Sequence, residues 1–192
     1  MRIAIFGVTC AVGRELIYNA LQQGHDVTVV SKNPACLEAN EANLEIVKAS
    51  VEDADSLENA LTGRDAVISA IDDQESISNI IQAMQKKQVK RFIGVLSSDT
   101  QASNSFLPGI LSRFFYSHSI NDLSKKCQSL GIEWTLIQPP VLTHEPPTGN
   151  YHLYFNGCPI GDKKVSVMDL AEFMIGELSS NQCMGKIVSV AY

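Results

Sequence analysis

Two glycines close to the N-terminus, Gly7 and Gly13, have a spacing that suits the binding of a phosphate group. An uninterrupted apolar run, residues 3–6, precedes Gly7, and apolar residues at helical spacing follow it. Glycine permits backbone angles that a side chain would forbid, so the chain can turn sharply at Gly7. The free N–H groups of a helix that begins at this turn would point at an anion. We therefore predict a phosphate-binding turn made by Gly7, Thr9, Cys10, Ala11, Val12 and Gly13; the alternative is a strand, turn and helix without a ligand.

A second polar group, Ser31, Lys32 and Asn33, follows the predicted strand at residues 25–30. In dinucleotide-binding folds, an acid at this point hydrogen-bonds the ribose of NAD, whereas a basic residue accommodates the 2′-phosphate of NADP. The stretch contains a lysine and no acid, so it predicts a preference for NADP(H) over NAD(H). The alternative is a solvated lysine in the turn that Asn33 and Pro34 would form in any case.

Candidate catalytic residues follow the predicted strand at residues 91–96. Ligands of open parallel sheets bind beyond the C-terminal ends of the strands, which places Ser97 and Ser98 near a substrate or a nicotinamide. Tyr116 and His118 are further candidates, as proton donors, near the end of a long stretch without periodicity at residues 100–116. The alternatives are a simple turn for the serines and a surface histidine at a helix start. The aromatic residues of the long stretch could wall a pocket, form a dimer face or pack in the core.

Apolar patterning predicts the elements that must position these residues. Strand patterns alternate with helix patterns along most of the chain, which is typical of a parallel sheet. The predicted strands are residues 3–6, 25–30, 44–48, 65–71, 91–96, 132–137, 151–155, 163–166 and 186–190. Predicted helices begin near Val12 and cover residues 53–61, 75–87, 120–130 and 167–178. The last helix begins after Ser166, and Asp169 stands where a capping box would have its acid.

Composition excludes several classes of function. The chain has 192 residues, 45% hydrophobic and 19% charged, with a formal net charge of −6 and no dense basic run, which argues against nucleic-acid binding. Five dispersed cysteines without metal-ligand spacing indicate reduced thiols in a cytoplasmic protein and no metal site. No stretch reaches the roughly 18–20 apolar residues of a membrane span. We expect the N-terminal apolar run to be a buried strand and not a signal peptide.

Several segments together resemble a known family. They are residues 3–13, 27–32, 63–68, 89–93 and 96–98, followed by Leu130-Gly131, Pro139-Pro140 and residues 148–151. In this order they are similar to the atypical short-chain dehydrogenase/reductase proteins of the NmrA-like group, above all to NADPH-dependent flavin reductases of the biliverdin reductase B kind. The resemblance covers nearly the whole chain. It implies that Lys32 binds the 2′-phosphate and that Ser97 lies beside the nicotinamide. It also implies a cofactor site that includes Ser50, Val51, Ala70, Ile71, Asp72 and Pro139.

The chain departs from this family at chemically important positions. Cys10 replaces a glycine of the phosphate-binding turn, Cys36 a second basic residue, and Ser50 an aspartate. A thiol at a helix N-terminus is often reactive. One hypothesis is therefore that oxidation of Cys10 blocks the cofactor; the alternative is a small, tolerated residue. The Tyr-x-x-x-Lys pair of typical short-chain dehydrogenases is absent, because Tyr116 is followed by Ile120 at that spacing.

The resemblance and the patterning lead to one expected architecture and two main functional hypotheses. We expect a single α/β domain, residues 1–192, with a Rossmann-like doubly wound parallel sheet in the order 3-2-1-4-5-6-7. Residues from about 140 to 192 would add a small substrate lobe.

The leading functional hypothesis is an NADP(H)-dependent reductase of a small planar acceptor, flavin-like, quinone-like or a related carbonyl compound. The alternative is a non-catalytic NmrA-like redox sensor that binds NADP. A sugar-nucleotide epimerase fits less well, since the Tyr/Lys pair is missing and the C-terminal region is short. The sequence leaves a homodimer open.

Overall fold

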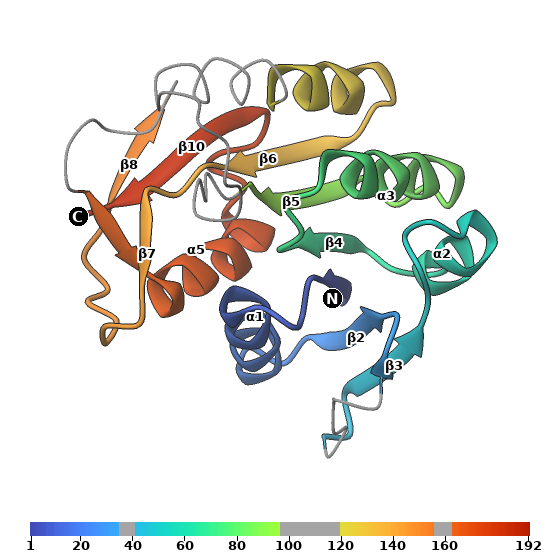
Figure 1. Cartoon of the computed structure of the whole chain (residues 1–192), viewed down its shortest axis with the longest axis horizontal. Coiled ribbons are helices and arrows are strands. Elements are labelled where there is room, and N and C mark those ends of the chain that lie inside the picture. Colours follow the sequence, from blue (N-terminus) through green and yellow to red (C-terminus); the bar gives the residue numbers. More distant parts are fainter. Residues whose placement is uncertain (35–40, 97–119, 156–162) are drawn as a thin grey trace, which may run out of the picture.

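A mixed sheet runs through the middle of the molecule (Figure 1). The computed structural model describes residues 1–34, 41–96, 120–155 and 163–192. Within these ranges the main sheet has eight strands in the order β3-β2-β1-β4-β5-β6-β10-β8. Their bounds, in sheet order, are Leu44–Lys48, Asp26–Ser31, Arg2–Phe6, Ala66–Ser69, Arg91–Val95, Glu133–Ile137, Lys186–Ala191 and His152–Phe155. Apart from β8, neighbouring strands are parallel. The predicted fold class is confirmed.

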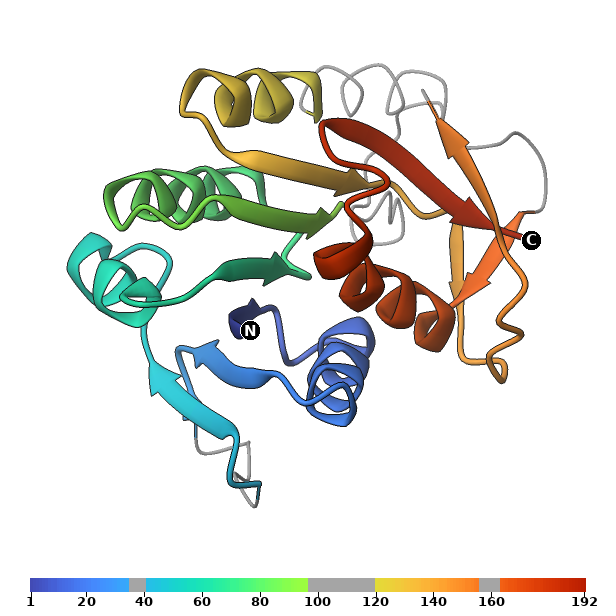
Figure 2. The same ribbon diagram turned by 180° about the vertical axis from the view of Figure 1, so that it is seen from behind.

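Helices cover both faces of this sheet, as the two opposite views show (Figures 1 and 2). Helix α1 (Ala11–Gln22) and helix α5 (Val167–Ser180) pack side by side on one face. Helix α2 (Ala54–Leu61), helix α3 (Gln74–Lys86) and the helical residues 120–129 lie on the other. None of the helices in the described ranges is long and apolar enough to cross a membrane.

The alternation of side chains along the central strands builds two separate cores. Along β1, Ile3 and Ile5 enter the core under α1 and α5, while Ala4 and Phe6 enter the core under α2 and α3. All four residues are at most 1% exposed. This burial on both faces explains why β1 appears in the sequence as a continuous apolar run without alternation.

The strand order reverses at β1, and this reversal positions the candidate site. The chain proceeds from β1 to β2 and β3 on one side and then returns to β4 on the other side of β1. The chain therefore leaves β1 and β4 toward helices on opposite faces of the sheet. In folds of this kind, ligands bind beyond the C-terminal ends of the strands at such a reversal. Gly7 follows β1 at this point, and Ala70 follows β4.

The C-terminal region differs in part from the expected arrangement. The expected sheet has seven strands, but β8 pairs antiparallel with β10 and adds an eighth strand at the edge. Strand β7 (Val141–Thr143), which the sequence analysis did not predict, pairs with β9 (Lys164–Ser166) in a separate two-stranded sheet. Three residues directly after two prolines are too few to show a periodic pattern, so β7 had no signal in the sequence.

Asp169 does not complete the predicted capping box. Ser166 caps α5 as expected and accepts a hydrogen bond from the Met168 N–H at 3.1 Å. The carboxylate of Asp169 instead accepts hydrogen bonds from the N–H groups of Thr148 and Gly149, both at 2.9 Å. It also accepts one from the Tyr192 hydroxyl at 2.5 Å. The fully buried Asp169 therefore fastens the loop before β8 and the end of β10 to α5.

Candidate nucleotide-binding site

The turn after β1 requires both of its glycines. Gly7 has a φ of +80°, and a Cβ there would lie 2.6 Å from the backbone carbon of Ala70. A Cβ on Gly13 would lie only 2.2 Å from the carbonyl oxygen of Gly7. Because the obstructing atoms belong to the backbone, no side-chain movement could relieve either contact. Gly7 lets the turn approach β4, and Gly13 lets α1 pack directly against the turn.

Cys10 is the N-cap of α1, and its thiol is directed back onto the turn. The Sγ atom accepts a hydrogen bond from the Gly13 N–H at 3.3 Å and donates one to the Gly7 carbonyl at 3.0 Å. The Cys10 side chain is nevertheless exposed. A sulfur atom thus takes the capping position that serine, threonine, aspartate or asparagine usually holds.

The same turn leaves backbone donors for an anion. Ala11 and Val12 form the first turn of α1, where an N–H group has no carbonyl four residues earlier in the helix. Among the described residues, the structure assigns no acceptor to either N–H group. Thr9 is exposed next to them. A glycine turn that a Cβ would block, followed by N–H groups with no acceptor in the described part of the chain, fits a pyrophosphate.

Lys32 lies at the C-terminal end of β2, where the sequence analysis places a 2′-phosphate. Its Nζ atom is 2.7 Å from Oε1 of Glu52, which belongs to the loop between β3 and α2. The Ser31 hydroxyl accepts a hydrogen bond from the Asn33 N–H at 3.2 Å. The structure therefore brings Ser31, Lys32 and Asn33 together but adds an acid that sequence reasoning missed. Glu52 follows Lys32 by 20 residues in a different loop, and only the pairing of β2 with β3 makes them neighbours.

The other expected cofactor contacts lie at the C-terminal ends of neighbouring strands. Ser50 and Val51 lie two and three residues after the end of β3, and both are half-buried. Ala70, Ile71 and Asp72 follow β4; Asp72 is exposed, and the Ile71 N–H donates to the Ser69 hydroxyl at 3.2 Å. Like the glycine turn, these residues lie at the C-terminal ends of the parallel strands. The role of each in cofactor binding stays a prediction.

The remaining predicted residues are divided between the described and undescribed parts of the chain. Pro139 is buried just after β6. The candidate catalytic residues Ser97, Ser98, Tyr116 and His118 lie outside the described residues, and so do Cys36 and the stretch at residues 100–116. Their assignment stays a prediction.

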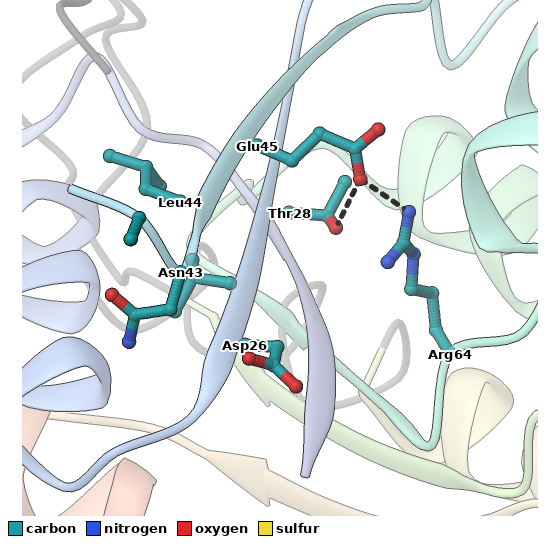
Figure 3. A pocket seen from close by; sticks show the side chains of 8 residues that line it. Asp26, Thr28, Asn43, Leu44, Glu45 and Arg64 are labelled. Atoms are coloured by element: carbon teal, nitrogen blue, oxygen red, sulfur yellow. Dashed lines mark hydrogen bonds and ion pairs between the residues drawn. The ribbon is translucent and has the colours of Figure 1, made fainter. Parts of the chain in front are cut away.

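A depression of about 160 Å³ lies on the side of the sheet where the parallel strands begin, away from the glycine turn (Figure 3). Its labelled lining residues are Asp26, Thr28, Asn43, Leu44, Glu45 and Arg64. Within it, Arg64 contacts the Glu45 carboxylate at 2.7 Å, and the Thr28 hydroxyl donates to the same carboxylate at 3.2 Å. The polar groups of Arg64, Glu45 and Thr28 therefore already have hydrogen-bond partners in one another, and the pocket lies at the N-terminal ends of β2 and β3. We therefore do not assign the nucleotide to it.

The strand reversal at β1, the glycine turn and the open start of α1 define a dinucleotide-binding domain of the Rossmann type. Sequence comparison agrees with this class. The chain belongs to the NAD(P)H-binding family, whose model matches residues 7–181. This membership is consistent with the predicted atypical short-chain dehydrogenase/reductase group.

Individual relatives show the same fold. A candidate epimerase from Bacteroides thetaiotaomicron superposes with a TM-score of 0.83 at 24% identity, covering 100% of this chain and 96% of that one. A candidate NADH-flavin reductase from Streptococcus pneumoniae superposes with a TM-score of 0.73 at 20% identity, covering 100% and 99%. A wide-type short-chain dehydrogenase/reductase from Veillonella parvula, solved in complex with NADP, gives 0.77 at 16% identity, covering 100% and 94%.

A curated relative is the Arabidopsis thaliana protein named "Probable pinoresinol-lariciresinol reductase 3". It is 26% identical to this chain, and the match covers 96% of the chain. The chain spans only 65% of the length of that relative. The family and the fold thus establish an NAD(P)H-binding protein with a Rossmann-type fold.

Proposed function

We propose that this protein is an NADP(H)-dependent reductase of a small planar acceptor, such as a flavin, a quinone or a related carbonyl compound. The main supporting observation is the glycine turn, where a Cβ at Gly7 or Gly13 would meet backbone atoms at 2.6 or 2.2 Å. A turn this tight suits a pyrophosphate, since it is followed by N–H groups for which the described ranges hold no acceptor. The NADH-flavin reductase and NADP-bound relatives named above agree with the proposed reaction class and cofactor.

In this proposal the chain contributes mainly binding and orientation. The N–H groups of Ala11 and Val12 hold the pyrophosphate, and Lys32 holds the 2′-phosphate. A bound nicotinamide supplies the hydride, while Ser97 orients the nicotinamide or the acceptor. Reductions of this kind depend mostly on holding two planar rings in a reactive arrangement, so the missing Tyr/Lys pair does not exclude them.

A second candidate is a redox sensor that binds NADP without turning it over. The observation that favours it is Cys10, whose exposed thiol forms hydrogen bonds inside the phosphate-binding turn. A sensor needs a reactive group where oxidation and nucleotide binding affect each other. Tight NADPH binding with no turnover of flavins, quinones or aldehydes would favour the sensor over the reductase.

The first test is calorimetric titration of the reduced protein with NADPH and with NADH, repeated on Lys32→Ala. We expect the wild-type protein to bind NADPH more tightly than NADH, and we expect the variant to bind NADPH no more tightly than NADH. Lys164→Ala is a matched control, because Lys164 also forms an exposed ion pair, with Glu145 at 2.6 Å, but on β9. Failure of the wild-type protein to bind either nucleotide would contradict the proposed function.

A further inference from the structure

The ion pair between Lys32 and Glu52 places opposite charges at the point where the cofactor is recognised. Lys32 Nζ and Glu52 Oε1 are 2.7 Å apart, and the two side chains are 56% and 77% exposed. An exposed pair of this kind contributes little to stability. Lys32 can therefore exchange the carboxylate for a phosphate at little cost.

The backbone that carries Glu52 is fixed from several sides. The Glu52 N–H donates to the Ser50 hydroxyl at 3.2 Å, and the Ser50 N–H donates to the Ser56 hydroxyl at 3.3 Å. The side-chain amide of Asn79, on α3, donates to the Val51 carbonyl at 3.1 Å. Because these bonds hold the turn, the backbone of Glu52 is fixed near the end of β2, and its carboxylate stays within reach of that strand end when Lys32 turns away.

We propose that Glu52 is a selectivity residue, which disfavours the phosphorylated cofactor and so reduces the preference for NADPH that Lys32 creates. This inference rests on the proposed function. A carboxylate beside the lysine repels a phosphate dianion, whereas it accepts hydrogen bonds from the ribose hydroxyls of a cofactor without that phosphate. The protein then uses both NADPH and NADH, with a modest difference in affinity between them.

The test is a four-variant cycle, in which the dissociation constants of NADPH and NADH are measured by calorimetry. For Glu52→Gln we expect NADPH to bind roughly two- to fivefold more tightly, with NADH changed less than about 1.5-fold. For Lys32→Ala we expect NADH to bind more tightly than NADPH, because Glu52 then acts alone. We compare the proteins by the ratio of the NADH dissociation constant to the NADPH dissociation constant, which Glu52→Gln should raise. In the double variant this ratio should return toward one.

A matched control is Glu45→Gln. Glu45 is 58% exposed and forms an ion pair with Arg64 at the same distance, 2.7 Å. This pair lies near the N-terminal ends of β2 and β3, away from Lys32. The substitution of Glu45 should leave the ratio unchanged. If Glu52→Gln leaves the ratio unchanged or lowers it while the wild-type protein binds both nucleotides, only this inference is wrong. If the wild-type protein binds neither nucleotide, the proposed function fails and this inference fails with it.

Discussion

At the scale of single residues, Cys10 connects the structure of the turn to its chemistry. The thiol caps α1 through Gly13 and remains exposed to solvent, whereas Cys127 and Cys183 are buried. Burial raises the pKa of Cys127 to about 12 and also raises the pKa of Cys183. Among the cysteines that the structure describes, oxidants should therefore reach Cys10 first.

We expect mild peroxide treatment to weaken NADPH binding at least tenfold, with recovery after dithiothreitol. Peroxide converts the thiol to sulfenic acid and is itself reduced to water, and the added oxygen would occupy the proposed phosphate site. Calorimetry before and after treatment measures the effect. Cys10→Ser is the control, since its hydroxyl can keep the cap but cannot be oxidised in this way. Equal loss of binding in Cys10→Ser would assign the effect to another cysteine and end the hypothesis.

At the scale of elements, Asp169 joins three segments that are distant in sequence. It lies in the first turn of α5 and holds the loop at Thr148 and Gly149, together with Tyr192 after β10. Burial acts to raise the pKa of Asp169, but hydrogen bonds from Thr148, Tyr192 and Gly149 outweigh it and leave the pKa below its ordinary value. Burial, and then the bond to Asp169, raise the pKa of Tyr192, which therefore remains a hydrogen-bond donor.

We expect Asp169→Asn to lower the free energy of unfolding at pH 7 by about 2 kcal/mol or more, because the amide cannot replace a carboxylate that accepts from several donors. A lowered native pKa means that this stabilisation is present above the unfolded pKa of about 4 and is lost as the pH falls through the native pKa. Urea unfolding from pH 7 to pH 3 should show the two proteins converging at acid pH. A constant difference across this range would contradict the account.

At the scale of the whole molecule, a buried ion pair joins the sheet to α5. It lies at the N-terminal ends of the strands, away from the candidate site. Arg91 at the start of β5 and Glu177 near the end of α5 are 6% and 1% exposed, with 3.5 Å between Nη2 and Oε2. Arg91 also donates to the Thr135 hydroxyl on β6 at 2.9 Å, and Glu177 accepts from the Cys183 N–H at 3.0 Å. Burial lowers the pKa of Arg91, and the charge of Glu177 opposes this shift.

We expect Glu177→Gln to destabilise the fold by about 3 kcal/mol, because it leaves the buried Arg91 without its counter-charge. Nucleotide affinity should stay within about twofold of the wild-type value, since the pair lies at the N-terminal ends of the strands. Urea unfolding and calorimetry measure the two quantities. The exposed pair of Glu145 and Lys164 provides the control, and Glu145→Gln should cost less than about 1 kcal/mol. A similar loss in both variants would contradict this role of the buried pair.

The sequence predicted most of the fold because burial on both faces of a parallel sheet leaves a simple pattern. The apolar run at residues 3–6 and the helical spacing after Val12 correspond to β1 and α1 within a residue or two. It could not predict β7, which is three residues long, or the antiparallel placement of β8, because strand direction depends on how the chain returns. Asp169 was placed in the right helix but given the wrong hydrogen-bond partner, since Thr148 and Tyr192 are more than 20 residues away in the sequence.

The tight turn after β1 is determined by the sequence alone, because its residues are neighbours and a side chain at Gly7 or Gly13 would meet backbone atoms. The charges that surround Lys32 are visible only in the tertiary structure. The end of β2 contains Lys32 and no acid, so the sequence favoured NADP(H), yet the pairing of β2 with β3 brings the Glu52 carboxylate to 2.7 Å from that lysine. A charge acts across space irrespective of its distance along the chain, so only the folded arrangement could show that two opposite charges share this position.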